Sequence, residues 1–246
     1  RLIRRQRQMC IRDSSKHVFV IADYSQIELR VLAHLSNDKS MIDMLQNRES
    51  DIHSETASKI FQTNIESVTK DMRRKAKEVN FGLIYGMESF GLSKSLNISK
   101  KEAEELIEAY FSQFPKIKGF LDKIVDDATT NTFTETLYGR KRYIKELASS
   151  NFQLKAMGKR IAMNAPIQGT ASDIMKIAMI KLNKEIQKIK STDLLLQIHD
   201  EIIIQTPKES ANKVSKIVKK EMEGASKLKV PLFVDIKENI NLSNLN

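Results

Sequence analysis

Two aspartates each follow a short apolar segment of the kind that forms a buried strand. Val18-Phe-Val-Ile-Ala22 ends at Asp23, and His199-Asp200-Glu201 stands between the apolar segments 194–198 and 202–205. The second pattern predicts a hairpin with polar residues at its turn. In neighbouring strands of one sheet the carboxylates of Asp23 and Asp200 would meet, and paired carboxylates are suited to holding Mg²⁺ for phosphoryl transfer.

Simpler explanations of these residues stay open at this point. Each aspartate, taken alone, is also explained as a solvent-exposed residue at a turn or strand end. His199 is either a metal ligand or a hydrogen-bonding neighbour of the acidic turn, and Glu201 is a candidate auxiliary ligand.

A second set of residues recurs every four positions after Thr69. Arg73, Lys77, Phe81 and Tyr85 would share one face of a helix that is basic first and aromatic later. Cations near a helix N-terminus oppose the macrodipole, which favours an external anion such as a triphosphate as their partner, and aromatic rings offer faces for a base. The alternative is that the aromatic residues are core and the basic pair is a solvated face.

The elements that would position these residues follow a simple order. Strands are predicted at 18–22, 194–198, 202–205 and 230–236, and helices at 26–46, through most of 51–151, at 171–190 and around 214–222. Within the helical part, Ser99-Lys-Lys-Glu102 has the form of a capping box. Apolar strands at both ends of the chain with helices between them indicate an α+β fold, a sheet domain interrupted by a helical insertion.

Composition sets limits on the class of protein. The 246 residues carry 41 Lys and Arg against 31 Asp and Glu, a formal charge of +10. That charge favours a nucleic-acid partner, although a lysine-rich surface explains it equally well. One cysteine, Cys10, excludes an internal disulfide and fits a reducing, intracellular compartment. No apolar segment approaches the roughly 20 residues of a membrane span, and the basic N-terminus lacks the features of a secretory signal.

Three segments together resemble motifs A, B and C of family A DNA polymerases, the bacterial DNA polymerase I type. They are Asp23-Tyr-Ser-Gln-Ile-Glu-Leu-Arg30, Arg73-Arg-Lys-Ala-Lys-Glu-Val-Asn-Phe-Gly-Leu-Ile-Tyr-Gly86 and Gln197-Ile-His-Asp-Glu201. The resemblance extends from about Val18 to the C-terminus. It implies template-directed addition of dNTPs to a primer 3′-hydroxyl, with release of pyrophosphate, in DNA replication and repair.

The resemblance also implies a role for each matching residue. Two Mg²⁺ ions, for which Mn²⁺ can substitute, would be held by Asp23, Asp200 and the Tyr24 carbonyl, with Glu201 as a secondary acid. Lys77 would donate a proton to pyrophosphate, and Glu28 would pack against Tyr85 as a steric gate that blocks a ribose 2′-hydroxyl. The residues implied to contact the dNTP are Gln26, Glu28, His53, Arg73, Lys77, Phe81 and Tyr85. Those implied to contact primer-template DNA are Arg160, Asn164, Gln168 and His199.

In family terms, the fold expected is an antiparallel palm sheet with packed helices, interrupted by a mostly helical fingers subdomain. We assign residues 15–38 and 156–246 to the palm and 39–155 to the fingers, with the motif B helix at about 69–86. The family's thumb is absent, and residues 1–14 depart from the family pattern and are assigned as a non-native segment. The chain is therefore expected to be a thumb-less fragment of a longer polymerase, monomeric and cytoplasmic, without a membrane partner.

Two rival functions follow from the same residues. A non-catalytic DNA-binding remnant would bind DNA without any dNTP-dependent tightening. A metal-dependent phosphohydrolase would use the paired acids but have no use for the face from Arg73 to Tyr85.

Overall fold

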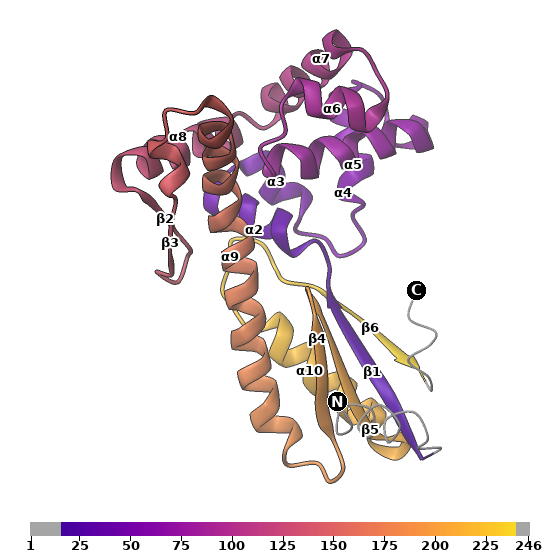
Figure 1. The fold of residues 1–246 in the computed structure, drawn as a ribbon. Coiled ribbons are helices and arrows are strands. Elements are labelled where there is room, and N and C mark those ends of the chain that lie inside the picture. The colour runs from indigo at the N-terminus through magenta and orange to yellow at the C-terminus, as the bar shows by residue number, and fades with distance from the viewer. Residues whose placement is uncertain (1–15, 240–246) are drawn as a thin grey trace. The chain divides into compact units, whose positions relative to one another are not determined.

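A computed structural model describes residues 16–239 of the chain (Figure 1). The chain divides into two compact units, each built from separate segments. One consists of the chain up to Ile27 together with Ser172–Lys227 and the part from Leu232 onward, and the other of Glu28–Ala171 with Leu228–Pro231. We call them the sheet unit and the helical unit.

The sheet unit contains four antiparallel strands in the order β4-β5-β1-β6. The strands are β1 (His17–Tyr24), β4 (Asp193–Ile198), β5 (Glu201–Pro207) and β6 (Val234–Asn239). β1 is central and pairs with β5 from His17↔Pro207 to Asp23↔Glu201. The expected hairpin is therefore confirmed as β4–β5, whereas the last strand begins at Val234 and not at 230.

Both faces of the central strands are covered. Val20, Ile202 and Ile204 are fully buried on one face, and Phe19, Ile21 and Ile203 form a cluster on the other. Helix α10 (Ala211–Glu223) packs against β1, β5 and β6. The Tyr24 hydroxyl donates to the Met222 carbonyl oxygen at 2.7 Å, so the end of β1 is tied to this helix.

Helix α9 (Phe152–Ile186) contributes to both units and is longer than the helix predicted at 171–190. Pro166 lies inside it. Because proline lacks an N–H and clashes with the preceding turn, the sequence favoured a helix start beyond it. In the sheet unit the buried positions of α9 are Ile174, Met175, Ala178, Leu182 and Ile186.

The helical unit confirms the helix-rich reading of 51–151. Its helices are α2 (Ile27–Ser36), α3 (Lys39–Met44), α4 (Ile52–Ile60), α5 (Lys70–Ile84), α6 (Ser89–Leu96), α7 (Lys100–Gln113) and α8 (Pro115–Asn131), followed by the first part of α9. Short 3-10 helices occur at Ile65–Ser67 and Lys145–Ala148 here, and at Lys208–Ser210 in the sheet unit. The Ser99 hydroxyl caps α7 by accepting from the Glu102 N–H, but the Glu102 side chain pairs with Lys75 instead of closing a capping box.

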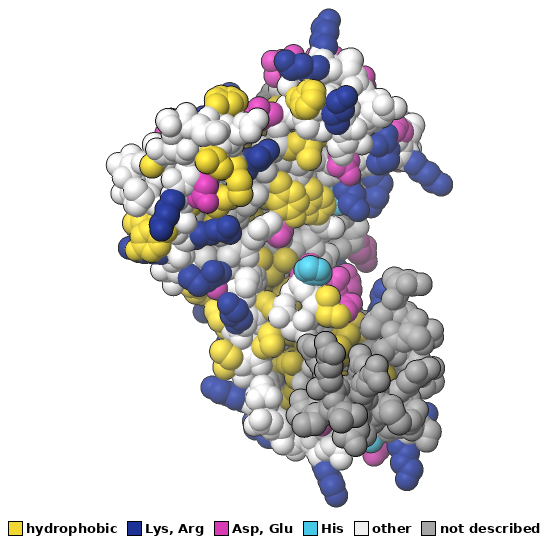
Figure 2. All heavy atoms as spheres, viewed as in Figure 1, with side chains coloured by type: hydrophobic (Ala, Val, Ile, Leu, Met, Phe, Trp, Pro, Cys, Tyr) yellow, Lys and Arg dark blue, Asp and Glu magenta, His cyan; other side chains and the backbone are white. Residues whose placement is uncertain are grey.

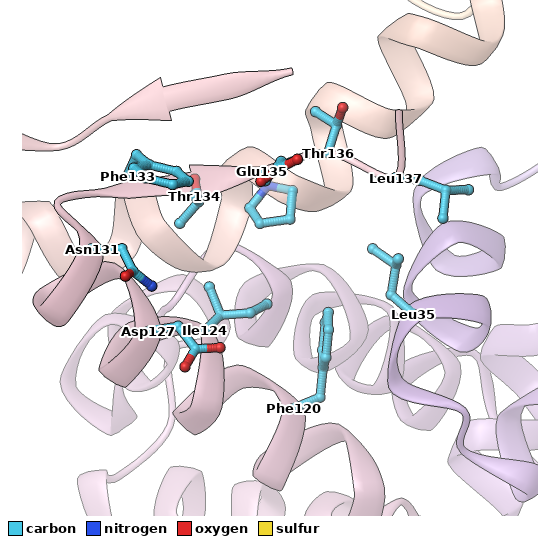
Figure 3. Close-up of a pocket in the computed structure, with 11 residues that line it drawn as sticks. Leu35, Phe120, Ile124, Asp127, Asn131, Phe133, Thr134, Glu135, Thr136 and Leu137 are labelled. Atoms are coloured by element: carbon cyan, nitrogen blue, oxygen red, sulfur yellow. The ribbon is translucent and has the colours of Figure 1, made fainter. Parts of the chain in front are cut away.

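One hairpin in this unit was not predicted. Strands β2 (Phe133–Glu135) and β3 (Lys141–Tyr143) pair antiparallel, and the turn between them contains Gly139 at φ +79°. Three-residue strands are too short to show an alternating pattern. A cavity of about 280 Å³ lies against β2, lined on its helical side by Leu35, Phe120 and Ile124 (Figure 3).

Basic side chains are frequent on the surface, as expected for a chain with 41 Lys and Arg. Lysine and arginine side chains are spread over the visible face of each unit, with apolar side chains between them (Figure 2). No helix between residues 16 and 239 is both long and apolar enough to cross a membrane.

The boundaries of the two compact units differ from the predicted boundaries between palm and fingers, at 38/39 and 155/156. The compact units are defined by packing alone, so the division into palm and fingers stays a prediction. The predicted non-native segment, residues 1–14, lies outside the described residues.

Candidate active site

Four acidic residues gather at one end of the sheet. Asp23, near the end of β1, faces Glu201 of β5 on one side and Asp235 of β6 on the other. Asp200 lies in the β4–β5 turn, and its carbonyl oxygen accepts from the Tyr24 N–H at 3.2 Å. The structure thus brings Asp23, Asp200 and Glu201 together, and strand pairing is the reason.

The crowding of these acids is visible in the electrostatics of Asp23. Partial burial, reinforced by the charges of Asp200, Glu201 and Asp235, raises the pKa of Asp23 to about 6, against the opposing effect of Lys237. A site that gathers negative charge without neutralising it is one that a divalent cation would stabilise.

The residues present fit a metal that is only partly held by protein. Among residues 16–239 no group of three or more His, Cys, Asp and Glu side chains is arranged to hold a metal ion alone. Two carboxylates, a backbone carbonyl and the phosphates of a substrate are the kind of ligand set that Mg²⁺ takes. Asp23 and Asp200 are the residues that would supply the carboxylates.

The turn itself has an unusual backbone. His199 adopts φ +53°, a conformation in which histidine is enriched but most residues are rare. Its side chain is exposed beside Asp200. Asp235 was not predicted as a site residue. The feature that could have indicated it is an acidic residue within the last predicted apolar strand.

The helical unit carries the basic and aromatic face on α5. Arg73 and Lys77 are exposed, and the Phe81 and Tyr85 rings stack with centroids 6.4 Å apart. The Tyr85 hydroxyl donates to a Glu28 carboxylate oxygen at 2.9 Å. The predicted neighbours Glu28 and Tyr85 are therefore in contact, although their role as a steric gate stays a prediction.

His53 lies behind this face. It is 3% exposed, its ring centroid is 5.7 Å from that of Phe81, and its Nδ1 is 3.2 Å from the Asn80 amide nitrogen. Burial, with the charges of Arg73 and Lys77, lowers the pKa of His53 to about 4 in spite of Asp51, so it is neutral at pH 7. Its Nε2 has no hydrogen-bond partner among the described residues. Asn80, which holds His53, was not predicted from the sequence.

Gly86 shows why its position excludes a side chain. Its φ is +67°, and a Cβ there would lie 2.9 Å from Cγ of Arg160 on α9. The group that approaches this glycine closely is the chain's own Arg160. Farther along α9, Asn164 Oδ1 is buried without a partner in the described chain, and Gln168 lies beside Arg140 and Arg142 in a small pocket. Gln26 is half-buried at φ +54° in the sheet unit.

An antiparallel sheet with acids at its end, together with a helical unit that bears a basic and aromatic helix, matches the class of nucleotide polymerases to which the motifs pointed. The model of DNA polymerase family A matches residues 1–243. The chain belongs to DNA polymerase family A.

Similar proteins agree with this assignment. DNA polymerase I of Caldicellulosiruptor bescii is 51% identical over 229 residues, 92% of this chain and 26% of its own length. The proteins from Bacillus caldotenax and Thermus aquaticus are 46% and 44% identical over 94% and 89% of this chain, each again over 26% of its own length. The chain thus spans about a quarter of the length of these relatives.

A solved structure has the same fold. It is the POL domain of Pol1 from M. smegmatis in complex with a DNA primer-template and dNTP, 38% identical with a TM-score of 0.88. The match covers 93% of this chain and 40% of that one. The predicted α+β fold is therefore confirmed.

Proposed function

We propose that this chain carries the nucleotidyl-transfer centre of a template-directed DNA polymerase. The observation that carries the proposal is the meeting of Asp23 and Asp200 at one sheet end in a family A chain, where burial and the charge of Asp200 raise the pKa of Asp23. The substrates are a primer-template DNA and dNTPs, the products a primer longer by one nucleotide and pyrophosphate.

In this proposal the sheet unit supplies the metal ligands. Asp23, Asp200 and the Tyr24 carbonyl would hold the ions, and Glu201, paired with Asp23 across the strands, would add negative charge beside them. Two bound Mg²⁺ or Mn²⁺ ions would activate the primer 3′-hydroxyl and stabilise the leaving pyrophosphate. His199, exposed at the turn, contacts the primer end.

The helical unit supplies the nucleotide contacts. Arg73, Lys77 and the neutral His53 bind the triphosphate, and Lys77 gives its proton to the departing pyrophosphate. Phe81 stacks on the incoming nucleotide, to which Gln26 of the sheet unit adds a contact. Arg160, Asn164 and Gln168 contact the primer-template.

One observed contact supports a proposal for how the sugar is selected. The Tyr85 hydroxyl holds the Glu28 carboxylate at 2.9 Å. A carboxylate fixed in this way would occupy the space that a ribose 2′-hydroxyl needs, which would select dNTPs over rNTPs.

In family terms the proposal assigns residues 15–38 and 156–246 to the palm and 39–155 to the fingers, in a monomeric, cytoplasmic fragment of a longer polymerase. The two rivals, a DNA-binding remnant and a metal-dependent phosphohydrolase, use only part of this machinery. The phosphohydrolase has no use for the face from Arg73 to Tyr85, and the DNA-binding remnant would bind DNA without any dNTP-dependent tightening.

Primer extension tests the proposal. It would be measured on the full chain and on a Caldicellulosiruptor bescii DNA polymerase I in which this chain replaces the matching 26%. We expect template-directed, Mg²⁺-dependent incorporation of dNTP, and Glu28→Ala should raise rNTP incorporation relative to dNTP by roughly 100-fold. Release of nucleotides from DNA, or DNA binding unaffected by the complementary dNTP, would favour a rival.

A further inference from the structure

Asp51, which precedes helix α4, gathers four donors on one carboxylate. Arg73 donates from Nε to Oδ2 at 2.6 Å and from Nη2 to Oδ1 at 3.3 Å. The His53 backbone N–H donates to Oδ1 at 3.2 Å, and the Ser54 hydroxyl to Oδ2 at 2.8 Å. Both oxygens are used twice, so the carboxylate has a single orientation.

The two groups that Asp51 fixes are proposed nucleotide contacts. Its capping bond holds the first turn of α4, from which the buried His53 side chain extends. Its bidentate bond holds the guanidinium plane of Arg73, at the start of α5. One carboxylate therefore joins the starts of two helices.

The bond to Arg73 leaves part of the guanidinium available. Of its five N–H donors, two face Asp51, and those on Nη1 and the second of Nη2 remain. Arg73 makes no other ion pair with a described residue, and the pair is exposed, at 47% for Arg73 and 41% for Asp51. An anion can reach the remaining donors without breaking the bond to Asp51.

We propose that Asp51 is a positioning residue that presents the remaining N–H groups of Arg73 to the dNTP triphosphate. The inference rests on the function proposed above. Asp51 acts through Arg73 and His53 and does not touch the nucleotide, since two negative groups in contact would repel. The pairing with Arg73 lowers the pKa of Asp51 to about 2, against the opposing effect of burial, so the carboxylate is ionised at every pH of interest.

Asp51→Asn separates this role from helix capping. Asparagine caps a helix as well as aspartate does, because its side-chain oxygen still accepts the His53 N–H. Its amide nitrogen cannot accept from Arg73, so the bidentate bond is lost. Asp51→Ser, which also caps, is a second variant without the charge.

Helix α5 offers a matched control. Asp71 forms an equally short ion pair with Arg74, at 2.6 Å, on the same helix, and neither residue is among the proposed contacts. Asp71→Asn removes an exposed carboxylate and an arginine partner without touching Arg73.

The test is the dissociation constant of dNTP, and of inorganic tripolyphosphate as a base-free probe, for the full chain bound to primer-template. We expect Asp51→Asn and Asp51→Ser to weaken both about fivefold, because an exposed ion pair holds its partners modestly. Asp71→Asn should leave both unchanged. In an Arg73→Lys background, Asp51→Asn should have no further effect, because lysine cannot be held bidentately.

Several results would overturn the inference. An unchanged dissociation constant in Asp51→Asn, or an equal loss with and without Arg73, would show that the carboxylate only caps α4. Tighter binding would show that Asp51 competes with the triphosphate for Arg73. Failure of the wild-type chain to extend primers counts against the proposed function instead, since triphosphate binding is read without turnover.

Discussion

Asp23 lies between Glu201 and Asp235, with Asp200 in the adjoining turn, so four carboxylates share one sheet end. Such crowding is unfavourable for a folded chain without a bound cation, because like charges repel and burial disfavours ionisation. Such unfavourable electrostatic interactions, with strongly shifted pKa values, are concentrated at catalytic and binding sites of proteins. At the scale of single residues, this crowding supports the proposal that the acid cluster binds a cation.

The raised pKa of Asp23 predicts how stability depends on pH. Its ordinary value is 3.8 and its value in the folded chain is about 6. Protonated Asp23 favours the folded state below pH 4, and that advantage is lost as pH rises through 6. Asp23→Asn, which stays neutral, should therefore be more stable than the wild type at pH 8, by about 1 kcal/mol after allowance for solvent screening.

Thermal unfolding in metal-free buffer measures this difference. The melting temperature of Asp23→Asn should exceed that of the wild type by roughly 2–4 °C at pH 8, and the gap should close near pH 4. Asp193→Asn, at the far end of β4, is the control and should show no gap. A constant gap at both pH values would mean that neither burial nor the neighbouring acids raise the pKa of Asp23.

At the scale of elements, the hairpin β2–β3 contains a polar group without a partner. The Thr134 hydroxyl is buried, the residue being 6% exposed, and it makes no hydrogen bond within the described part of the chain. Thr134 lines the cavity beside α8 (Figure 3). Thr170, on α9, is also buried, but its hydroxyl accepts from the Leu137 N–H at 3.0 Å.

These two threonines give opposite predictions for one substitution. Thr134→Val removes an unsatisfied hydroxyl at constant shape and should stabilise the chain by about 1 kcal/mol. Thr170→Val leaves the Leu137 N–H without its acceptor and should destabilise it by a similar amount. Urea unfolding of both variants measures the two free energies, and effects of the same sign would refute the account of the hairpin.

Elements differed in how far the sequence predicted them. Helix α5 was predicted closely because its residues recur at helical spacing and Thr69 caps it. The first half of α9 was missed because Pro166 obscured the helix, and exposed apolar residues, such as Phe152 and Leu154, break the expected stripe. Strand β6 was displaced because the apolar segment at 230–233 precedes the strand.

The candidate site residues also differ in how far the sequence predicted them. Asp23 and Asp200 were predictable because each follows an apolar segment that is typical of a buried strand. Asp51, Asn80 and Asp235 were not, because their importance lies in what they contact across the fold: Arg73, His53 and Asp23. Contacts between residues that are far apart in the sequence produce no regular spacing from which they could be predicted.

At the scale of the whole molecule, each compact unit contributes a different part of the proposed machinery. The sheet unit holds the acids, and the helical unit holds the basic and aromatic face. In the proposed function the two act together, and the chain, a member of DNA polymerase family A, spans about a quarter of the length of its curated relatives. The central claim is therefore that the acids at the sheet end perform the chemistry.

Single-turnover incorporation of one complementary dNTP, with Mg²⁺, tests that claim most directly. It would be measured in the chain grafted into the Caldicellulosiruptor bescii polymerase, for the wild type, Asp200→Ala and the control Asp193→Ala from the same hairpin. We expect Asp200→Ala to slow incorporation on the order of 1,000-fold, with DNA binding retained, and Asp193→Ala to match the wild type. Near-normal incorporation by Asp200→Ala would contradict the account.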